Sequence, residues 1–295
     1  MTIPAKPVFW RDSRLSHVEL RKVADGRQVR YAPHSHKQWS IGAITEGQST
    51  FHYRNDRYRV GAGDLVFMNP GWVHDCNPID NQAWAYYMMH LDTVWLTKLR
   101  FTAGLLPTPH WQDLPTAVLS TGDWHDRYCN VAACLLDASR ALLVKQTVLA
   151  EFLSDLMHEL AKQPIGPDHQ APASLKKLAG YLDSQATEDV SLDVLCKRSG
   201  YSAGYLIRAF KQHFGLTPHA YLINRRIQLG QGELRCGIPI AEVALNAGFA
   251  DQPHFQRTFK RLVAATPNEY RISSIDDEID TARSQHPGQH AVDCD

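Results

Sequence analysis

Two clusters of polar and basic side chains near the carboxyl end carry chemistry suited to nucleic acid. The first predicted cluster is Gly204, Ile207, Arg208 and Lys211. The second is Gln252, Pro253, His254, Gln256, Arg257 and Lys260. An arginine can donate two parallel hydrogen bonds to guanine, a glutamine amide pairs with adenine, and a lysine suits a phosphate. Phosphate contacts carry no sequence information, so the alternative is that Arg208 and Arg257 only grip the backbone of a duplex.

A repeated pattern of two helices and a tight turn is predicted to position both clusters. Gly200 marks the first turn, and Gly248 marks the second turn 48 residues later. Leu206 and Phe255 begin equivalent apolar stripes, 49 residues apart, which leave the polar clusters on the opposite, exposed faces. The stretch from 191 to 271 therefore predicts two helix-turn-helix units, a motif that places its second helix in the major groove of DNA.

A long helix from about 218 to 234 is predicted to join the two units. If it is rigid, the two recognition helices should enter successive major grooves on one side of a duplex, about one helical turn apart. Gly230 and Gly232 lie inside this helix. Each glycine costs about 1 kcal/mol relative to alanine, which predicts a joining helix that flexes.

A third group of candidate residues lies in the first part of the chain. Short segments rich in Val, Ile, Phe, Tyr and Trp, broken by Gly, Pro, Asn and Asp, predict strands through residues 1–122. Many short strands with regular turns predict a barrel or a double-sheet jelly roll, and a small barrel can enclose a ligand. Candidate wall residues for such a ligand are His34, His36, Trp39, Tyr53, His74, Tyr86 and His90.

The histidines resemble part of the cupin motifs. His34-Ser-His36, Glu46-Gly47 and the run from Gly63-Asp64 to His74 follow the outline of those motifs. In cupin enzymes, the corresponding histidines and glutamate hold a metal. Glu46 lies ten residues after His36, further than the enzyme pattern usually allows, so we predict no metal site and no cofactor. The alternative role for the histidines is to line the barrel mouth or to make structural hydrogen bonds.

The hydrophobic period changes after residue 122. Leucines at three- and four-residue steps predict an amphipathic helix from about 139 to 161, which would pack on the barrel, pair with a second copy, or do both. Three prolines and one glycine within twelve residues predict a linker. The prediction is a multidomain α+β protein with a cupin-like barrel (1–122), a helical dimerisation segment (123–161), a linker (162–173), an all-α DNA-binding domain (174–272) and an acidic disordered tail (273–295).

Charge is unevenly distributed although the 31 basic and 31 acidic residues balance. Residues 173–272 hold 13 basic and 8 acidic residues, whereas 273–295 hold one basic and six acidic residues. A basic domain followed by an acidic tail favours a nucleic-acid partner. One hypothesis is that the tail folds back and competes with DNA; the alternative is a solvated tail.

The cysteines, the start of the chain and the lengths of its apolar runs bear on the cellular compartment and on membrane association. The six cysteines include no CxxC pair, which is typical of a reducing cytosol rather than a disulfide framework. The start of the chain lacks a basic segment followed by an apolar one, and no run of about 18 apolar residues occurs. We therefore expect a cytoplasmic protein without a membrane partner.

Over about one hundred residues, the carboxyl-terminal stretch resembles the DNA-binding domain of the AraC/XylS transcriptional regulators. The motifs that carry the resemblance include SerGlyTyrSer (199–202), TyrLeu-x-Arg-x-PheLys (205–211), GlyPheAlaAspGln (248–252), HisPhe-x-Arg-x-PheLys (254–260) and ThrPro-x-x-TyrArg (266–271). The barrel, helical segment and linker ahead of it match the family's usual arrangement. The resemblance implies promoter DNA, a small effector bound by the barrel, a homodimer and RNA polymerase as partners.

The leading functional hypothesis is a sequence-specific transcriptional regulator whose barrel senses a small effector. The alternative is a metal-binding cupin enzyme with a DNA-binding appendage. No GxSxG, P-loop or dinucleotide glycine pattern occurs, so we predict no catalytic residues. The two DNA-facing clusters differ in polarity, and Pro253 cannot hydrogen-bond a base. An asymmetric, non-palindromic half-site is therefore expected.

Overall fold

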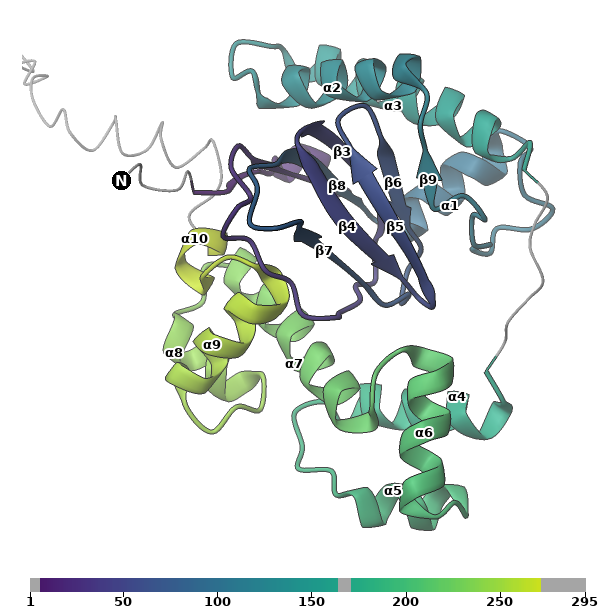
Figure 1. The fold of residues 1–295 in the computed structure, drawn as a ribbon, viewed down its shortest axis with the longest axis vertical. Coiled ribbons are helices and arrows are strands. Elements are labelled where there is room, and N and C mark those ends of the chain that lie inside the picture. The colour runs from purple at the N-terminus through teal and green to yellow at the C-terminus, as the bar shows by residue number, and fades with distance from the viewer. Residues whose placement is uncertain (1–5, 164–170, 272–295) are drawn as a thin grey trace, which may run out of the picture.

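The computed structural model describes residues 6–163 and 171–271. The amino-terminal half is built on two antiparallel sheets (Figure 1). The larger sheet runs in the order β1 (Val8–Trp10), β2 (Val18–Val23), β8 (Ala85–Leu91), β3 (Trp39–Glu46), β6 (Leu65–Met68) and β9 (Val118–Leu119). The smaller sheet has the order β5 (Asp56–Gly61), β4 (Gln48–Tyr53) and β7 (His74–Pro78). The predicted barrel therefore takes its double-sheet form.

Strand alternation gives the larger sheet two different faces. Side chains of successive residues point to opposite sides of a strand, so each face takes every second residue. On one face, Val23, Ile44 and Tyr86 pack against Phe51 and Cys76 of the smaller sheet. The opposite face packs against helices.

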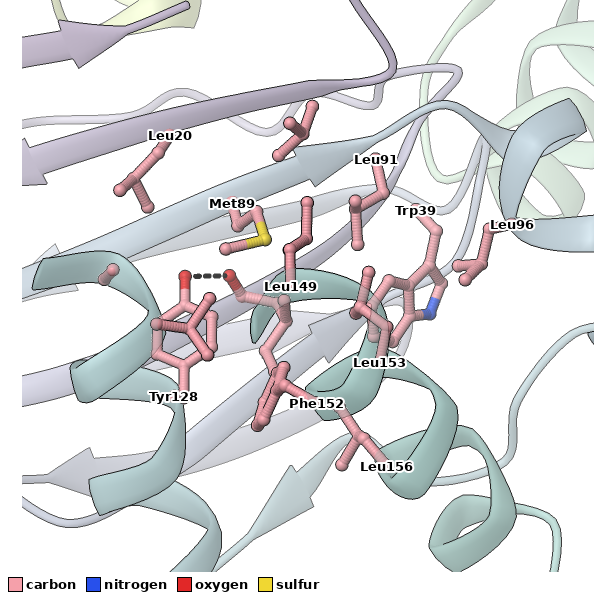
Figure 2. Packing of buried hydrophobic residues seen from close by; sticks show 14 of the residues in the cluster. Leu20, Trp39, Met89, Leu91, Leu96, Tyr128, Leu149, Phe152, Leu153 and Leu156 are labelled. Atoms are coloured by element: carbon pink, nitrogen blue, oxygen red, sulfur yellow. Dashed lines mark hydrogen bonds between the residues drawn. The ribbon is translucent and has the colours of Figure 1, made fainter. Parts of the chain in front are cut away.

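Helix α1 (Thr93–Thr102) lies between β8 and β9, and helices α2 (Gly122–Leu136) and α3 (Leu142–Leu160) follow β9. In Figure 2, Leu149 and Leu153 of α3 point toward Met89 and Leu91 of the sheet, in one buried cluster. The Tyr128 hydroxyl of α2 donates to the Ile41 carbonyl oxygen at 2.9 Å. The predicted amphipathic helix is therefore α3, and its leucines pack on the sheet. Helix α1 interrupts a region that was expected to hold only strands.

Residues 171–271 form helices and no strands, which confirms the multidomain α+β class. Helix α4 (Ala173–Ser184) precedes the first helix-turn-helix unit, α5 (Leu192–Ser199) and α6 (Ala203–Phe214). The second unit is α8 (Ile240–Asn246) and α9 (Gln252–Val263), followed by α10 (Pro267–Arg271). Helix α7 (Pro218–Arg235) runs between the two units (Figure 1).

Local sequence explains where these helices begin and turn. The side chains of Ser202 and Asp251 accept hydrogen bonds from backbone N–H groups in the first turns of α6 and α9. Gly200, between α5 and α6, has a φ of 72°, a left-handed conformation that glycine adopts without strain. Within the described residues, no helix is long and apolar enough to cross a bilayer.

Candidate DNA-binding surface and interdomain cavity

Helix α6 exposes the first predicted cluster. Arg208 and Lys211 are exposed, as are Gly204 and Ile207 between them and the start of the helix. The opposite side of α6 carries Leu206 and Phe210, whose side chains are fully buried. The amphipathic pattern therefore fixes which side of α6 is free for a partner.

Helix α9 exposes most of the second predicted cluster. Pro253, His254, Arg257 and Lys260 are exposed, and Gln252 and Gln256 are half-buried. Phe255 and Phe259 anchor the helix from the buried side. All ten predicted residues are thus at least partly accessible.

Two arginines of α7 serve the scaffold instead of this surface. Arg225 pairs with Asp183 of α4, with Nε 2.5 Å from the carboxylate oxygen. Arg226 donates to three backbone carbonyl oxygens, those of Ala186 at 2.8 Å, Gly248 at 2.6 Å and Glu188 at 2.9 Å. Because Gly248 lies in the turn of the second unit and the other two carbonyls follow α4, Arg226 ties the two halves of the helical domain together.

A cavity of about 210 Å³ lies between the sheets and the helical domain. From the larger sheet, it is lined by Glu19, Arg21, Gly42, Ile44, Val66, Met68, Tyr86, Met88 and His90. The amino-terminal half also contributes Tyr31, His34, His36, His74 and Trp84. The helical domain contributes Asn224, Arg225, Gln228, Arg235 and Leu262. One occupant would therefore contact both domains.

Strand register explains the polar end of the cavity. The pairing of β2, β8 and β3 aligns Glu19, His90 and Ser40 in one row and Arg21, Met88 and Gly42 in the next. A Cβ on Gly42 would lie 2.6 Å from Cε of Met88, so the glycine leaves room for that side chain. Charged residues thus alternate with core residues along β2, where Leu20 faces the helices.

Four histidine rings meet at this end of the cavity. The ring centroids of His34 and His74 are 4.6 Å apart, those of His36 and His74 4.7 Å, and those of His36 and His90 4.9 Å. Burial lowers the pKa of all four rings, that of His90 to about 4, and neighbouring imidazoles lower those of His36 and His74 further. The four rings are therefore neutral near pH 7.

Hydrogen bonds to the backbone fix three of these rings. Nδ1 of His34 lies 2.9 Å from the carbonyl oxygen of Ala32. Nδ1 of His36 lies 2.8 Å from that of Gln38, and Nδ1 of His74 lies 2.9 Å from that of Trp72. Nδ1 of His90 lies 2.7 Å from the Ser40 hydroxyl. In the part of the chain that the structure describes, no three His, Cys, Asp or Glu side chains are arranged to bind a metal ion.

Hydrogen bonds between the two domains lie beside the cavity. Asn224 of α7 donates to the carbonyl oxygen of Ser35 at 3.1 Å, and Gln228 donates to the same oxygen at 2.6 Å. Arg21 donates to the carbonyl oxygens of Val263 at 2.7 Å and Ala264 at 3.0 Å, where α9 ends. A guanidinium there is favoured by the helix dipole.

The cavity contains most, but not all, of the predicted effector residues. His34, His36, His74, Tyr86 and His90 line it. Trp39 does not line it, because its side chain points to the helix-covered face and is buried there (Figure 2). Tyr53 does not line it either; it packs between the sheets, and its hydroxyl accepts from the Asn69 backbone N–H at 2.8 Å.

Sequence reasoning missed the charged cavity residues of β2 and all of those from the helical domain. Glu19 and Arg21 alternate with Val18, Leu20 and Val23 in the sequence of β2, and that partial alternation was an available signal. Asn224 and Gln228 carried no such signal, because only the packing of the two domains brings them to the cavity.

Comparison with known proteins agrees with this arrangement. Residues 17–164 match the AraC-like ligand binding domain, and residues 195–273 match a helix-turn-helix domain. The transcriptional regulator YbfI of Bacillus subtilis is 26% identical over 244 residues, 81% of this chain and 86% of that protein. The transcriptional activator RhaS of Escherichia fergusonii is 26% identical over 261 residues, covering 83% and 88% of the two chains.

A solved structure shares the fold over nearly the whole chain. ToxT of Vibrio cholerae with a bound unsaturated fatty acid superposes with a TM-score of 0.53 at 13% identity, covering 92% of this chain and 95% of ToxT. The ligand-binding match alone spans half of the sequence. Together with two helix-turn-helix units behind a double-sheet domain, these matches show that the chain belongs to the AraC/XylS family of transcriptional regulators.

Proposed function

We propose that this regulator responds to a small effector held in the interdomain cavity, and that occupancy changes how the two helix-turn-helix units are presented to promoter DNA. This proposal rests on one observation: β2 and β8 of the ligand-binding domain and α7 of the DNA-binding domain all contribute to the wall of the cavity. ToxT binds an unsaturated fatty acid, which supports a small-molecule effector for this fold.

Coupling would run through two sets of contacts. Asn224 and Gln228 hold α7, the helix that joins the two units, against the loop at Ser35. Arg21 holds the end of α9. An effector changes DNA binding only if it binds one domain arrangement more tightly than another, and a ligand touching both domains meets that condition.

The proposed base-reading residues are Arg208 in the first unit and Gln256 and Arg257 in the second. Lys211 and Lys260 are proposed to contact phosphates. The first face is otherwise small or apolar, with Gly204 and Ile207, so the two units would read unequal amounts of sequence. The proposed target is therefore a half-site without two-fold symmetry.

We also propose a homodimer formed through the helical segment, with RNA polymerase as a further partner at the promoter. On α3, Leu143 is 72% exposed and Val144 is 40% exposed, beside leucines that pack on the sheet. This short apolar surface supports a second copy as the partner of α3.

Selection of DNA from a random pool by the full-length protein, followed by footprinting, tests the proposed function. We expect an enriched, non-palindromic site with two major-groove contacts about one helical turn apart. Arg208→Ala and Arg257→Ala should each relax the sequence preference at a different position. Equal binding to every DNA sequence would rule out a sequence-specific regulator.

A further inference from the structure

The polar end of the interdomain cavity holds hydrogen-bond acceptors that no described residue satisfies fully. A carbonyl oxygen can only accept, so Nδ1 of His34, His36 and His74 must carry the proton in each bond to the backbone. In a neutral imidazole the other nitrogen, Nε2, is then a bare acceptor. Among the described residues, only the Ser40 hydroxyl approaches one of these atoms, Nε2 of His36 at 3.4 Å.

The same cavity has cations that lack a carboxylate partner. Both lining carboxylates are already paired, Glu19 with Arg11 at 2.7 Å and Asp183 with Arg225 at 2.5 Å. Arg21 is 4% exposed, and its hydrogen-bond partners are neutral: the Tyr31 hydroxyl and two backbone carbonyl oxygens. Against the effect of burial, Glu19 and Glu269 raise the pKa of Arg21, but within residues 6–163 and 171–271 neither Arg21 nor the exposed Lys37 forms a salt bridge, and Nε of the buried Arg21 has no hydrogen-bond partner. An anion in the cavity would supply a charged acceptor for that buried donor, so the cavity favours an anion.

The cavity is small and also has an apolar lining. Ile44, Val66, Met68, Trp84 and Met88 supply that lining. The volume of about 210 Å³ is below the roughly 300 Å³ at which typical drug-sized ligand pockets begin. The ligand must therefore be compact and carry an apolar part.

Resting on the proposed function, we propose that the effector is a small carboxylic acid that also carries N–H or O–H donors and an apolar side chain, as an amino acid or a hydroxy acid does. The carboxylate lies on the side of Arg21 and Lys37. The donor group faces Nε2 of His34, His36 and His74. The apolar side chain of the ligand packs against Trp84 and Met88.

Calorimetric titration of the full-length protein with matched compounds tests this ligand class. The complete ligands are L-leucine, L-phenylalanine, leucic acid and phenyllactate, and which pair binds distinguishes an amino acid from a hydroxy acid. Isocaproate and phenylpropanoate lack the donor, and leucinol and phenylalaninol lack the carboxylate. We expect a complete ligand to bind at least about tenfold more tightly than either of its truncated forms. Equal affinity for a truncated form, or no binding by any complete ligand, would overturn the proposal.

Histidine variants test where the N–H or O–H donor of the ligand binds. An Asn side chain retains an N–H that can reach the backbone carbonyl but lacks Nε2. His36→Asn and His74→Asn should therefore weaken the complete ligand about tenfold and leave isocaproate binding unchanged. His158→Asn is the matched control, because Nδ1 of that exposed ring also lies 2.8 Å from a backbone carbonyl oxygen, outside the cavity. Equal losses in all three variants would contradict the assignment.

A measurement on the unaltered protein covers the case in which a variant fails to fold. In ring-¹⁵N-labelled protein, binding of the complete ligand should shift the Nε2 resonance of at least one of the three cavity rings. An unchanged set of Nε2 resonances at saturation would overturn the donor contact. DNA selection without ligand is independent of these results, so a failure here is distinguishable from a failure of the proposed function.

Discussion

Gly230 of α7 lies against the ring of Phe255 of α9. A Cβ built on Gly230 would lie 2.8 Å from Cε2 and 3.0 Å from Cζ of that ring, and 3.3 Å from Cγ1 of Val243. Phe255 is fully buried in the core of the second helix-turn-helix unit. The joining helix therefore approaches the recognition helix at a point where only glycine fits.

We expect Gly230→Ala to destabilise the protein. The added methyl gains about 1 kcal/mol of helix propensity but overpacks a buried ring, which typically costs about 1–3 kcal/mol. Gly232 is the matched control, because a Cβ there meets nothing within 4 Å. Gly232→Ala should raise the free energy of unfolding by up to about 1 kcal/mol. Chemical denaturation measures both variants, and equal stabilisation by the two would contradict the packing argument.

The same pair of residues shows what the sequence could and could not predict. Helix propensity treats Gly230 and Gly232 alike, and it predicted a joining helix that flexes. Their difference arises only from α9, which approaches one of them. Flexing of α7 at Gly232 stays a prediction.

Periodicity was a better guide where burial follows from one element alone. The stripes at Leu206 and Phe255 correctly predicted the exposed faces of α6 and α9. In β8, strand alternation places Tyr86, Met88 and His90 on one face, and all three line the cavity. The position of Trp39 was wrong because both faces of β3 are buried, so its pattern does not indicate which side holds the helices.

Arg226 should be required for the geometry of the DNA-binding domain. Arg226→Lys keeps the charge, but an ammonium cannot reproduce the planar fork that satisfies the carbonyls of Ala186, Glu188 and Gly248. Leaving these acceptors unpaired should lower the free energy of unfolding by about 1–3 kcal/mol. Denaturant titration provides the measurement, with the exposed Lys176→Arg substitution as a control for charge-preserving exchange. A stability equal to that of the wild type would show that water replaces the bonds.

DNA affinity should separate the base-reading residues from the phosphate contacts. Arg208→Ala and Arg257→Ala should each cost about 1–3 kcal/mol on the selected site and less on random DNA. Lys211→Ala and Lys260→Ala should weaken binding to all sequences and reduce the dependence of log K on log salt by about one unit each. Binding isotherms at several salt concentrations give both quantities. A uniform loss for the arginine variants would mean that they contact only phosphates.

Acid should destabilise the ligand-free protein through the cavity histidines. Burial lowers the pKa of His34, His36, His74 and His90 in the folded state, whereas the unfolded chain keeps an ordinary value of about 6.5. Below that pH the unfolded state binds more protons, so stability is present above about 6.5 and falls as the pH drops toward the folded values, by up to about 1.4 kcal/mol per pH unit for each ring. Urea unfolding between about pH 6.5 and pH 5 lies above the usual titration range of carboxyl groups. His74→Asn removes one such ring and should flatten the slope by up to that amount, while an unchanged slope would show that the ring keeps an ordinary pKa in the folded protein.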